Sequence, residues 1–566
     1  MKKVMVLPAL ALIAGCMGYT QNDESDQSRD LNLQLLEYST HINESFLHNH
    51  LSILADDSME GRDTGMPGQR KAAEYLAGFY EDLGFTPAGD EEYFQHYTLS
   101  AQKTDSLVYY TRRVDGGDTL TVDHSVAGYG TSSRYITQSG GAIPLEGSIV
   151  FAGFGINDPE RGVTHLEGAD LSGKWLLMFD EIPHIVDGDT LINPMLNHNE
   201  RYARIFTETE ANGLIVISSG SEEGFVEREK TDSVLLVRPS SVRLAYLGQA
   251  AGRPETYDQA YLEVSPELAL EMLGIGSLEE LEAERQRLIE EIREFEAYEL
   301  PLMLDYRPYE GPAELEVENV IAKLEGGHPE RRDEVVVLMA HYDHVGVGRP
   351  DASGDRIYNG ADDNGSGTTA LMAIAEALAR AAEDGVRPDR TILFLHVSGE
   401  ERGLLGSRYY SDHPVIPIEN TVANFNADMI GRSDPENIEQ GDTDYIYIIG
   451  GEIISSGLDR LVHRANDMSV GMRLSYRYND LNDPNQFYRR SDHWNFGRLG
   501  VPFVFFFSGV HEDYHRPSDS IDKVDIPKLV RTTSLIYAST ILVANSDERP
   551  EVDNRQFIEI TQSQAR

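Results

Sequence analysis

Residues 391–407 read TILFLHVSGEERGLLGS, and this stretch decides how the chain is interpreted. An apolar run, typical of a buried strand, leads directly into Glu400 and Glu401. Two neighbouring carboxylates repel each other. Either both acids are solvated loop charges, or a positive group lies between them.

The same arrangement of an apolar strand followed by polar residues recurs from about residue 315 to 546. Strand-like runs alternate with helical runs such as SGTTALMAIAEALARAAEDG and IPKLVRTTSLIYASTILVANS. This alternation predicts an α/β fold, a mostly parallel mixed sheet sandwiched by helices. The other predicted strands of this region include EVVVLMA (334–340), VANFNA (422–427) and VPFVFFFSG (501–509).

A different pattern occupies the middle of the chain. Between about residues 105 and 244, short alternating runs are separated by turn residues, which predicts a mainly-β module with a helix near 203–213. Ser277 and Glu280 have capping-box spacing and open a charged helix. We expect that helix to be solvated and to bridge two domains.

The charge balance limits the partners. The 566 residues include 95 acidic and 48 basic ones, a net charge of -47. Nucleic acid is excluded as a partner, because phosphate binding needs a basic face. Cys16 is the single cysteine, so no disulfide can form within the chain.

The N-terminus predicts export. Met1–Lys3 is basic, residues 4–14 are mostly apolar, and small residues precede Cys16. This order resembles a bacterial lipobox, which implies lipidation of Cys16 and contact with a membrane only through that anchor. The expected location is the outer membrane, facing the periplasm or the cell surface. The alternative is a plain signal peptide with an incidental cysteine.

Ionisable side chains gather where the predicted strands end. In open α/β sheets, sites form outside the carboxyl ends of the strands. Histidine nitrogens and carboxylate oxygens are zinc ligands. One histidine and one carboxylate for each ion, with one shared carboxylate, would hold two ions. The ionisable residues at the strand ends and neighbouring loops include His341, Asp343, His344, Asp362, Asp363, Glu400, Glu401, Asp428, His511, Glu512, Asp513 and His515.

Five motifs together resemble peptidase family M28, the co-catalytic dizinc aminopeptidases. They are HYDH (341–344), NGADDNGSG (359–367), SGEERGLLGS (398–407), NADMIG (426–431) and DYHRPSDS (513–520). Residues 53–85 resemble the N-terminal part of longer bacterial members. Residues around 120–250 resemble their inserted protease-associated (PA) domain.

The resemblance implies a role for each matching residue. His341 and Asp428 would bind one Zn²⁺, Glu401 and His515 the other, and Asp363 would bridge both. A cis peptide would join Asp363 to Asn364. The resemblance also implies a zinc-peptidase/phosphorylase-like fold for the domain that carries these ligands.

Further roles surround these ligands. Asp343 would accept a hydrogen bond from the ring of His341. Glu400 would be the general base. Tyr514 is a candidate oxyanion donor, the alternative being a packed tyrosine. The Ser491-Asp492-His493 motif resembles a family motif that supports the site or faces the substrate, the alternative being plain structure. Arg490 is a candidate partner for a substrate carboxylate or an ordinary surface arginine, and His344 and His396 are predicted to be structural.

The resulting expectation is an exported dizinc aminopeptidase acting on peptides. The metals would activate a bridging water, and Glu400 would transfer its proton to the leaving amine. The alternatives are a carboxypeptidase, a single-zinc glutaminyl cyclase and a non-catalytic receptor-like relative. The expected segments are 1–15 signal peptide, 16–35 flexible tether, 36–115 N-terminal part of the peptidase domain, 116–255 PA-like insertion, 256–312 helical linker, 313–546 catalytic domain and 547–566 polar, frayed tail.

Overall fold

The computed structural model describes residues 26–564, apart from 114–121, 128–134, 140–143, 187–188, 194–195, 220, 227–238, 249–259, 349 and 352. The predicted signal peptide and Cys16 therefore lie outside the described residues. Within the described ranges, no helix combines the length and apolar character that crossing a bilayer requires.

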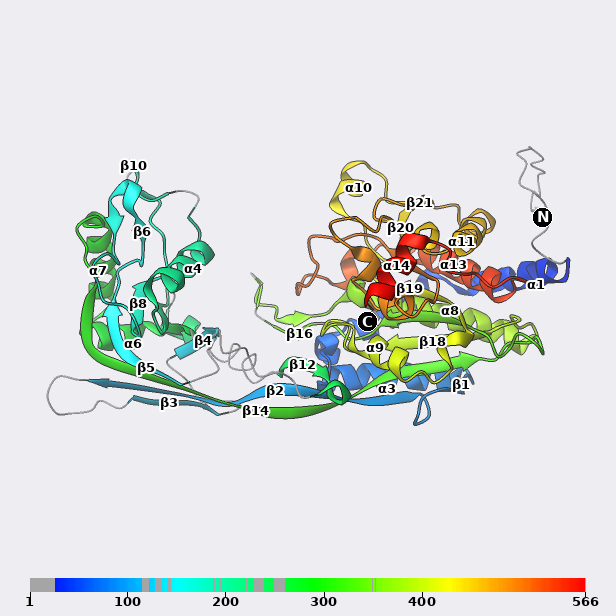
Figure 1. Cartoon of the computed structure of the whole chain (residues 1–566), viewed down its shortest axis with the longest axis horizontal. Coiled ribbons are helices and arrows are strands. Elements are labelled where there is room, and N and C mark those ends of the chain that lie inside the picture. Colours follow the sequence, from blue (N-terminus) through cyan, green and yellow to red (C-terminus); the bar gives the residue numbers. More distant parts are fainter. Residues whose placement is uncertain are drawn as a thin grey trace, which may run out of the picture.

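A long two-stranded ribbon joins two lobes of the molecule (Figure 1). Its strands are β2 (Phe94–Arg113) and β14 (Tyr298–Leu324), which pair antiparallel along almost their whole length. β14 also pairs with β5 (Leu145–Phe151) in the small lobe and with β18 (Thr391–Val397) in the large lobe. One hydrogen-bonded sheet thus continues through both lobes.

The large lobe is built on the strand order β21-β20-β22-β19-β15-β18-β14. Strands β15, β18, β19 and β22 run parallel, whereas β20 is antiparallel to β22 and β14 is antiparallel to β18. The predicted mostly parallel mixed sheet is confirmed. The bounds are β15 Val335–His341, β19 Thr421–Ala427, β20 Tyr445–Gly450, β21 Arg473–Ser475 and β22 Phe503–Phe507.

Helices cover both faces of this sheet. Successive side chains of a strand point to opposite faces, so Leu338 joins one core and Val337 the other. Because both faces are buried, the strands are continuous apolar runs. The Leu338 core includes α2 (Glu44–Leu54), α3 (Pro67–Asp82), α8 (Gly367–Glu383), α11 (Ser456–Met468) and α13 (Ile526–Ala544), and the Val337 core includes α9 (Leu405–Asp412) and α12 (His493–Gly497).

The small lobe combines the predicted mainly-β stretch, residues 105–244, with two helices that follow it. Strands β5, β8, β11 and β13 run parallel, and β4 is antiparallel to β13. The predicted helix near 203–213 is present as α4, but α6 and α7 lie beyond residue 255. Between residues 105 and 244 the described residues thus form more strand than helix, as predicted, whereas short apolar runs did not reveal that several of these strands are parallel. The bounds are β4 Tyr135–Ser139, β8 Trp175–Phe179, β11 Gly213–Ile217, β13 Ala260–Val264, α4 His198–Thr209, α6 Pro266–Leu273 and α7 Leu278–Glu290.

The helix α7 does not bridge the lobes as expected. Ser277 accepts a hydrogen bond from the backbone N–H of Glu280, so the predicted cap is present. Leu281 and Leu288, however, are buried in the core of the small lobe. The ribbon of β2 and β14 makes the connection instead, because backbone pairing along these strands needs no amphipathic face.

Both polar ends of the described chain are more ordered than predicted. Residues 26–35 of the expected tether lie in α1 (Asp26–Glu37), where Leu35 is fully buried. In the expected frayed tail, α14 (Arg555–Gln564) buries Phe557 beside Trp494 and Phe503. Only a few apolar side chains anchor each of these polar helices, which is too weak a signal for sequence periodicity.

The remaining short elements flank these cores. They are β1 (Thr86–Pro87), β3 (Val122–Ala127), β6 (Asn157–Asp158), β7 (Val163–Thr164), β9 (Ile185–Val186), β10 (Asp189–Thr190), β12 (Ser240–Leu244), β16 (Gly346–Val347), β17 (Ile357–Tyr358) and α10 (Pro435–Glu439).

Candidate metal centre

The carboxyl ends of adjacent parallel strands bring the predicted ligands together. β15 ends at His341, β18 leads into Glu401, and Asp428 directly follows β19. Asp363 lies in the turn that precedes α8, and its peptide bond to Asn364 is cis, as the family resemblance implied. The fifth predicted ligand, His515, lies in the segment after β22.

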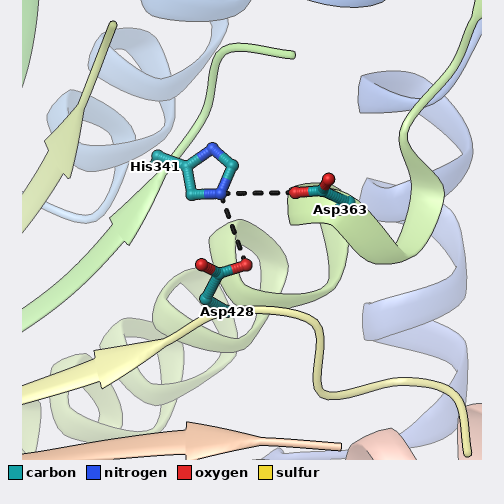
Figure 2. A group of neighbouring side chains, drawn as sticks. All are labelled: His341, Asp363 and Asp428. Carbon is teal, nitrogen blue, oxygen red and sulfur yellow. Dashed lines mark ion pairs between the residues drawn. The ribbon is translucent and has the colours of Figure 1, made fainter. Parts of the chain in front are cut away.

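One group of ligands contains His341, Asp363 and Asp428 (Figure 2). His341 Nε2 lies 3.4 Å from Asp363 Oδ1 and 3.3 Å from Asp428 Oδ1. All three side chains are buried. The other ring nitrogen, Nδ1, lies 3.1 Å from the backbone carbonyl of Asp343. Because a carbonyl only accepts, Nδ1 carries the proton of the neutral ring, which leaves the Nε2 lone pair for a metal.

A second group surrounds the other oxygen of Asp363. Asp363 Oδ2 lies 3.2 Å from His515 Nε2, which is also 3.1 Å from Glu401 Oε2. His344, expected to be purely structural, also belongs here. Its Nδ1 lies 2.9 Å from Glu401 Oε1, and His344, Asp363 and Glu401 could themselves hold an ion. The second histidine of the HYDH motif is the sequence feature that could have indicated this role for His344.

Unpaired polar atoms indicate that these residues fit a cation. Asp363 Oδ2, Asp428 Oδ1, His344 Nε2 and His515 Nε2 are buried and form no hydrogen bond. Such atoms destabilise a fold unless something satisfies them. Imidazole nitrogen and carboxylate oxygen are the donor set of zinc. The two groups therefore match metal ligands in both chemistry and burial.

The electrostatics of the cluster point the same way. Burial alone would lower the pKa of His341, but Asp428 and Glu400 raise it well above its usual value. Burial would also lower the pKa of His515, but the neighbouring Asp363 and Glu401 raise it to about 10. The carboxylates thus favour positive charge within this cluster. A divalent cation would supply that charge while the rings stay neutral, as metal ligation requires.

Glu400 differs from its neighbour Glu401. Glu400 lines the pocket beside His341, Asp363 and Asp428. Burial raises its pKa well above its usual value, although His341 opposes the shift. For Glu401, burial and the charge of Asp363 would raise the pKa, but the contacts with His344 and with the nearby ring of His515 lower it. One glutamate faces the pocket, and the other is held among the histidines.

Asp343 has a different contact from the one predicted. Its carboxylate lies 3.8 Å from His341 Nδ1, beyond hydrogen-bond range, because the ring nitrogen is directed at the backbone carbonyl instead. The carboxylate accepts hydrogen bonds from Thr64 Oγ1 at 2.8 Å and from the backbone N–H of Glu400 at 3.2 Å. Asp343 therefore positions the loop that carries both glutamates.

The Ser491-Asp492-His493 motif supports the site from one side. Ser491 Oγ donates to Asp428 Oδ2 at 2.8 Å and accepts from Asn426 Nδ2 at 2.9 Å. Asp492 accepts a hydrogen bond from Ser407. The His493 ring stacks on Phe505 with centroids 4.6 Å apart. Ser491 thus orients a ligand, whereas Asp492 and His493 fix the surrounding loops.

The pocket next to the cluster combines polar residues of the site with an apolar wall. Tyr514 lines it and stacks on His515, with ring centroids 3.9 Å apart. Arg490 is also part of the lining. The other lining residues away from the ligands include Met429, Phe487, Phe505, Phe507 and Val510.

Arg62 was not anticipated from the sequence. It is fully buried and donates hydrogen bonds to four backbone carbonyls, those of Leu54, Tyr342, Asn359 and Gly360, at 2.5–2.9 Å. It therefore ties the N-terminal segment to both loops that carry His341 and Asp363. A single arginine among turn residues offers no sequence signal for such a role.

Comparison with known proteins matches one region of the chain to a peptidase family. Residues 319–540 match the model of peptidase family M28, which confirms the family resemblance of this domain. Over 240 residues the chain is 26% identical to aminopeptidase YwaD of Bacillus subtilis, covering 40% of this chain and 45% of that protein. It is 30% identical over 227 residues to a probable leucine aminopeptidase of Arthroderma otae, covering 38% and 57%. The match thus spans about half of each curated relative.

Solved structures resemble the chain over most of its length. The zinc aminopeptidase BSAP from Bacillus subtilis aligns with a TM-score of 0.47 at 18% identity, covering 88% of this chain and 94% of that one. A peptidase M28 precursor from Shewanella amazonensis also aligns with a TM-score of 0.47, at 17% identity, covering 93% and 98%.

Proposed function

We propose that this chain, which carries a peptidase family M28 domain at residues 319–540, is an exported dizinc metallo-aminopeptidase. It would hydrolyse N-terminal residues from peptides. The names of the curated relatives, an aminopeptidase and a probable leucine aminopeptidase, support the reaction class. The predicted signal and Cys16 are the basis for export.

The position of Asp363 carries the proposal of two ions. Its Oδ1 faces His341, whereas its Oδ2 faces His515. A carboxylate with one oxygen toward each group of ligands is suited to bridging. His341 and Asp428 would complete one site, and His515 and Glu401 the other. His344 would hold Glu401 in place through its hydrogen bond.

The side chains around the ligands supply the proton transfers. When bound, the zinc ions provide Lewis acidity and lower the pKa of water. Glu400, facing the pocket, would take a proton from the attacking water onto its carboxylate and return it to the leaving amine. Asp343 would hold the Glu400 backbone for this transfer. The Tyr514 hydroxyl would donate a hydrogen bond to the oxyanion from the same pocket.

Metal analysis combined with a substrate pair tests the proposal. We expect two zinc-class ions per chain, cleavage of leucine p-nitroanilide, and no cleavage of its N-acetylated counterpart. A chelator should abolish turnover, and added zinc should restore it. One ion per chain would favour the glutaminyl cyclase alternative. Release of C-terminal residues from N-blocked peptides would favour a carboxypeptidase, and no turnover of any substrate would overturn the proposal.

A further inference from the structure

An arginine lines the pocket that contains the proposed general base. Arg490 shares this pocket with His341, Glu400 and Asp428. The next residue, Ser491, donates a hydrogen bond to Asp428. The backbone at Arg490 is therefore tied to a metal ligand, which fixes where its side chain starts.

The guanidinium of Arg490 forms no hydrogen bond or ion pair with any residue that the structure describes. Its contact is with the ring of Phe487, whose centroid lies 5.0 Å from Arg490 Cζ. Acidic residues outnumber basic ones by 95 to 48. An exposed arginine left unpaired in such a protein is available to an external carboxylate, and stacking on a ring pre-orients its planar fork.

The rest of the pocket restricts what can bind. Its wall away from the ligands is mainly apolar, formed by residues such as Met429, Phe505 and Phe507. A carboxylate within the pocket would therefore be drawn to Arg490 and to bound metal. In a dipeptide, the terminal carboxylate lies one residue beyond the scissile bond, and each added residue moves it up to ~3.5 Å farther away.

We propose that Arg490 binds a substrate carboxylate close to the scissile bond, so that dipeptides with a free C-terminus are preferred over longer or C-terminally blocked peptides. This inference rests on the proposed peptidase function. The carboxylate that binds Arg490 could also come from an acidic side chain on the N-terminal residue of the substrate. The apolar wall favours the C-terminal source, because burying an acidic side chain against aromatic rings would cost its hydration.

The test compares Arg490→Gln with Arg489→Gln in the metal-loaded protein. Arg489 is the adjacent exposed arginine, and it donates a hydrogen bond to Gln486. It is not part of the pocket lining, so its replacement removes the same charge from a position outside the pocket. We expect Arg490→Gln to lower kcat/KM for Leu-Gly about tenfold while leaving Leu-Gly amide within about twofold. Arg489→Gln should change neither value, and Arg490→Lys should recover only part of the loss.

A second substrate pair separates the two sources of carboxylate. Glutamate p-nitroanilide and glutamine p-nitroanilide differ only in the side-chain charge. Selective loss on the glutamate substrate in Arg490→Gln, with Leu-Gly unaffected, would overturn the dipeptide preference and assign Arg490 to an acidic N-terminal side chain. Equal loss on all substrates, or no loss on any, would overturn a role in carboxylate binding.

Metal content and wild-type activity keep this inference separate from the proposed function. Two ions per chain in every variant would show that the site is intact. If wild-type protein cleaves Leu-Gly amide but Arg490→Gln has no selective effect, the inference on Arg490 fails alone. If wild-type protein cleaves no peptide, the proposed function fails and the inference fails with it.

Discussion

Glu400 and Glu401 show how two adjacent residues acquire different roles. Glu401 is held by His344 and lies near His515, whereas Glu400 lines the open pocket. The repulsion expected between the two acids is relieved differently for each. The contacts with the histidines lower the pKa of Glu401, whereas burial raises the pKa of Glu400.

Replacing the proposed base separates proton transfer from metal binding. Glu400→Gln should lower kcat by roughly 10²–10⁴, because the amide cannot accept the proton from water. Metal content, measured by mass spectrometry, should stay at the wild-type value. Glu401→Gln is the matched control and should lose metal as well as activity. Full activity in Glu400→Gln would exclude this residue as the base.

Ser491 provides a second prediction on a residue that touches a ligand. Ser491→Ala removes the hydrogen bond to Asp428 Oδ2, so metal affinity should fall roughly 10–100-fold. Competition with a chelator measures this affinity directly. Ser469→Ala removes a hydroxyl that donates a hydrogen bond to the backbone carbonyl of Ala465 at the end of α11, and it should leave the metal affinity unchanged. Equal affinities in both variants would show that Asp428 needs no support from Ser491.

At the scale of elements, the parallel strands determine the site. The ends of β15, β18 and β19 lie side by side, so residues separated by dozens of positions converge at one edge of the sheet. Strand and helix order could be predicted because buried elements have strong apolar patterns. The polar helices α1 and α14 could not, because each is anchored by very few apolar side chains.

The docking of α14 can be tested by removing its anchor. Phe557→Ala should lower the free energy of unfolding by about 3–5 kcal/mol, because the ring is fully buried beside Trp494 and Phe503. Denaturant unfolding followed by circular dichroism measures the change. The neighbouring exposed residue supplies the control, and Gln556→Ala should stay within about 0.5 kcal/mol of the wild type. Similar stabilities for both variants would indicate a frayed tail after all.

At the scale of the whole molecule, the ribbon sets how the two lobes are connected. β2 and β14 continue from one lobe into the other, so a single sheet links the lobes in place of the predicted solvated helix (Figure 1). The assignment of the small lobe as a PA domain stays a prediction. The net charge of -47 argues against nucleic acid as a partner, because phosphates would be repelled.

The proposed anchor is also a property of the whole molecule. Cys16→Ser should move the protein from the membrane fraction to the soluble fraction and abolish incorporation of labelled fatty acid. Thr20→Ala, a nearby polar change that keeps the cysteine, should leave both unchanged. Fractionation with a blot against the protein measures the outcome. Continued membrane association of Cys16→Ser would end the lipoprotein proposal.

The sequence by itself determined the α/β class of the large lobe and the set of candidate ligands. Apolar periodicity reports burial, and zinc chemistry restricts the residue types that can serve. Assigning Glu400 and Glu401 to different roles needed the family resemblance as well, since their order along the chain does not distinguish them.

Only the tertiary structure decided which groups contact each other. It directed His341 Nδ1 to a backbone carbonyl rather than to the Asp343 carboxylate, and it placed His344 against Glu401. It also buried Arg62 against the two ligand loops and placed Arg490 at the pocket, without an ion pair among the described residues. These features depend on distances of a few ångströms between residues far apart in the chain. A one-dimensional pattern carries apolar periodicity and motifs, but not the directions in which polar side chains meet.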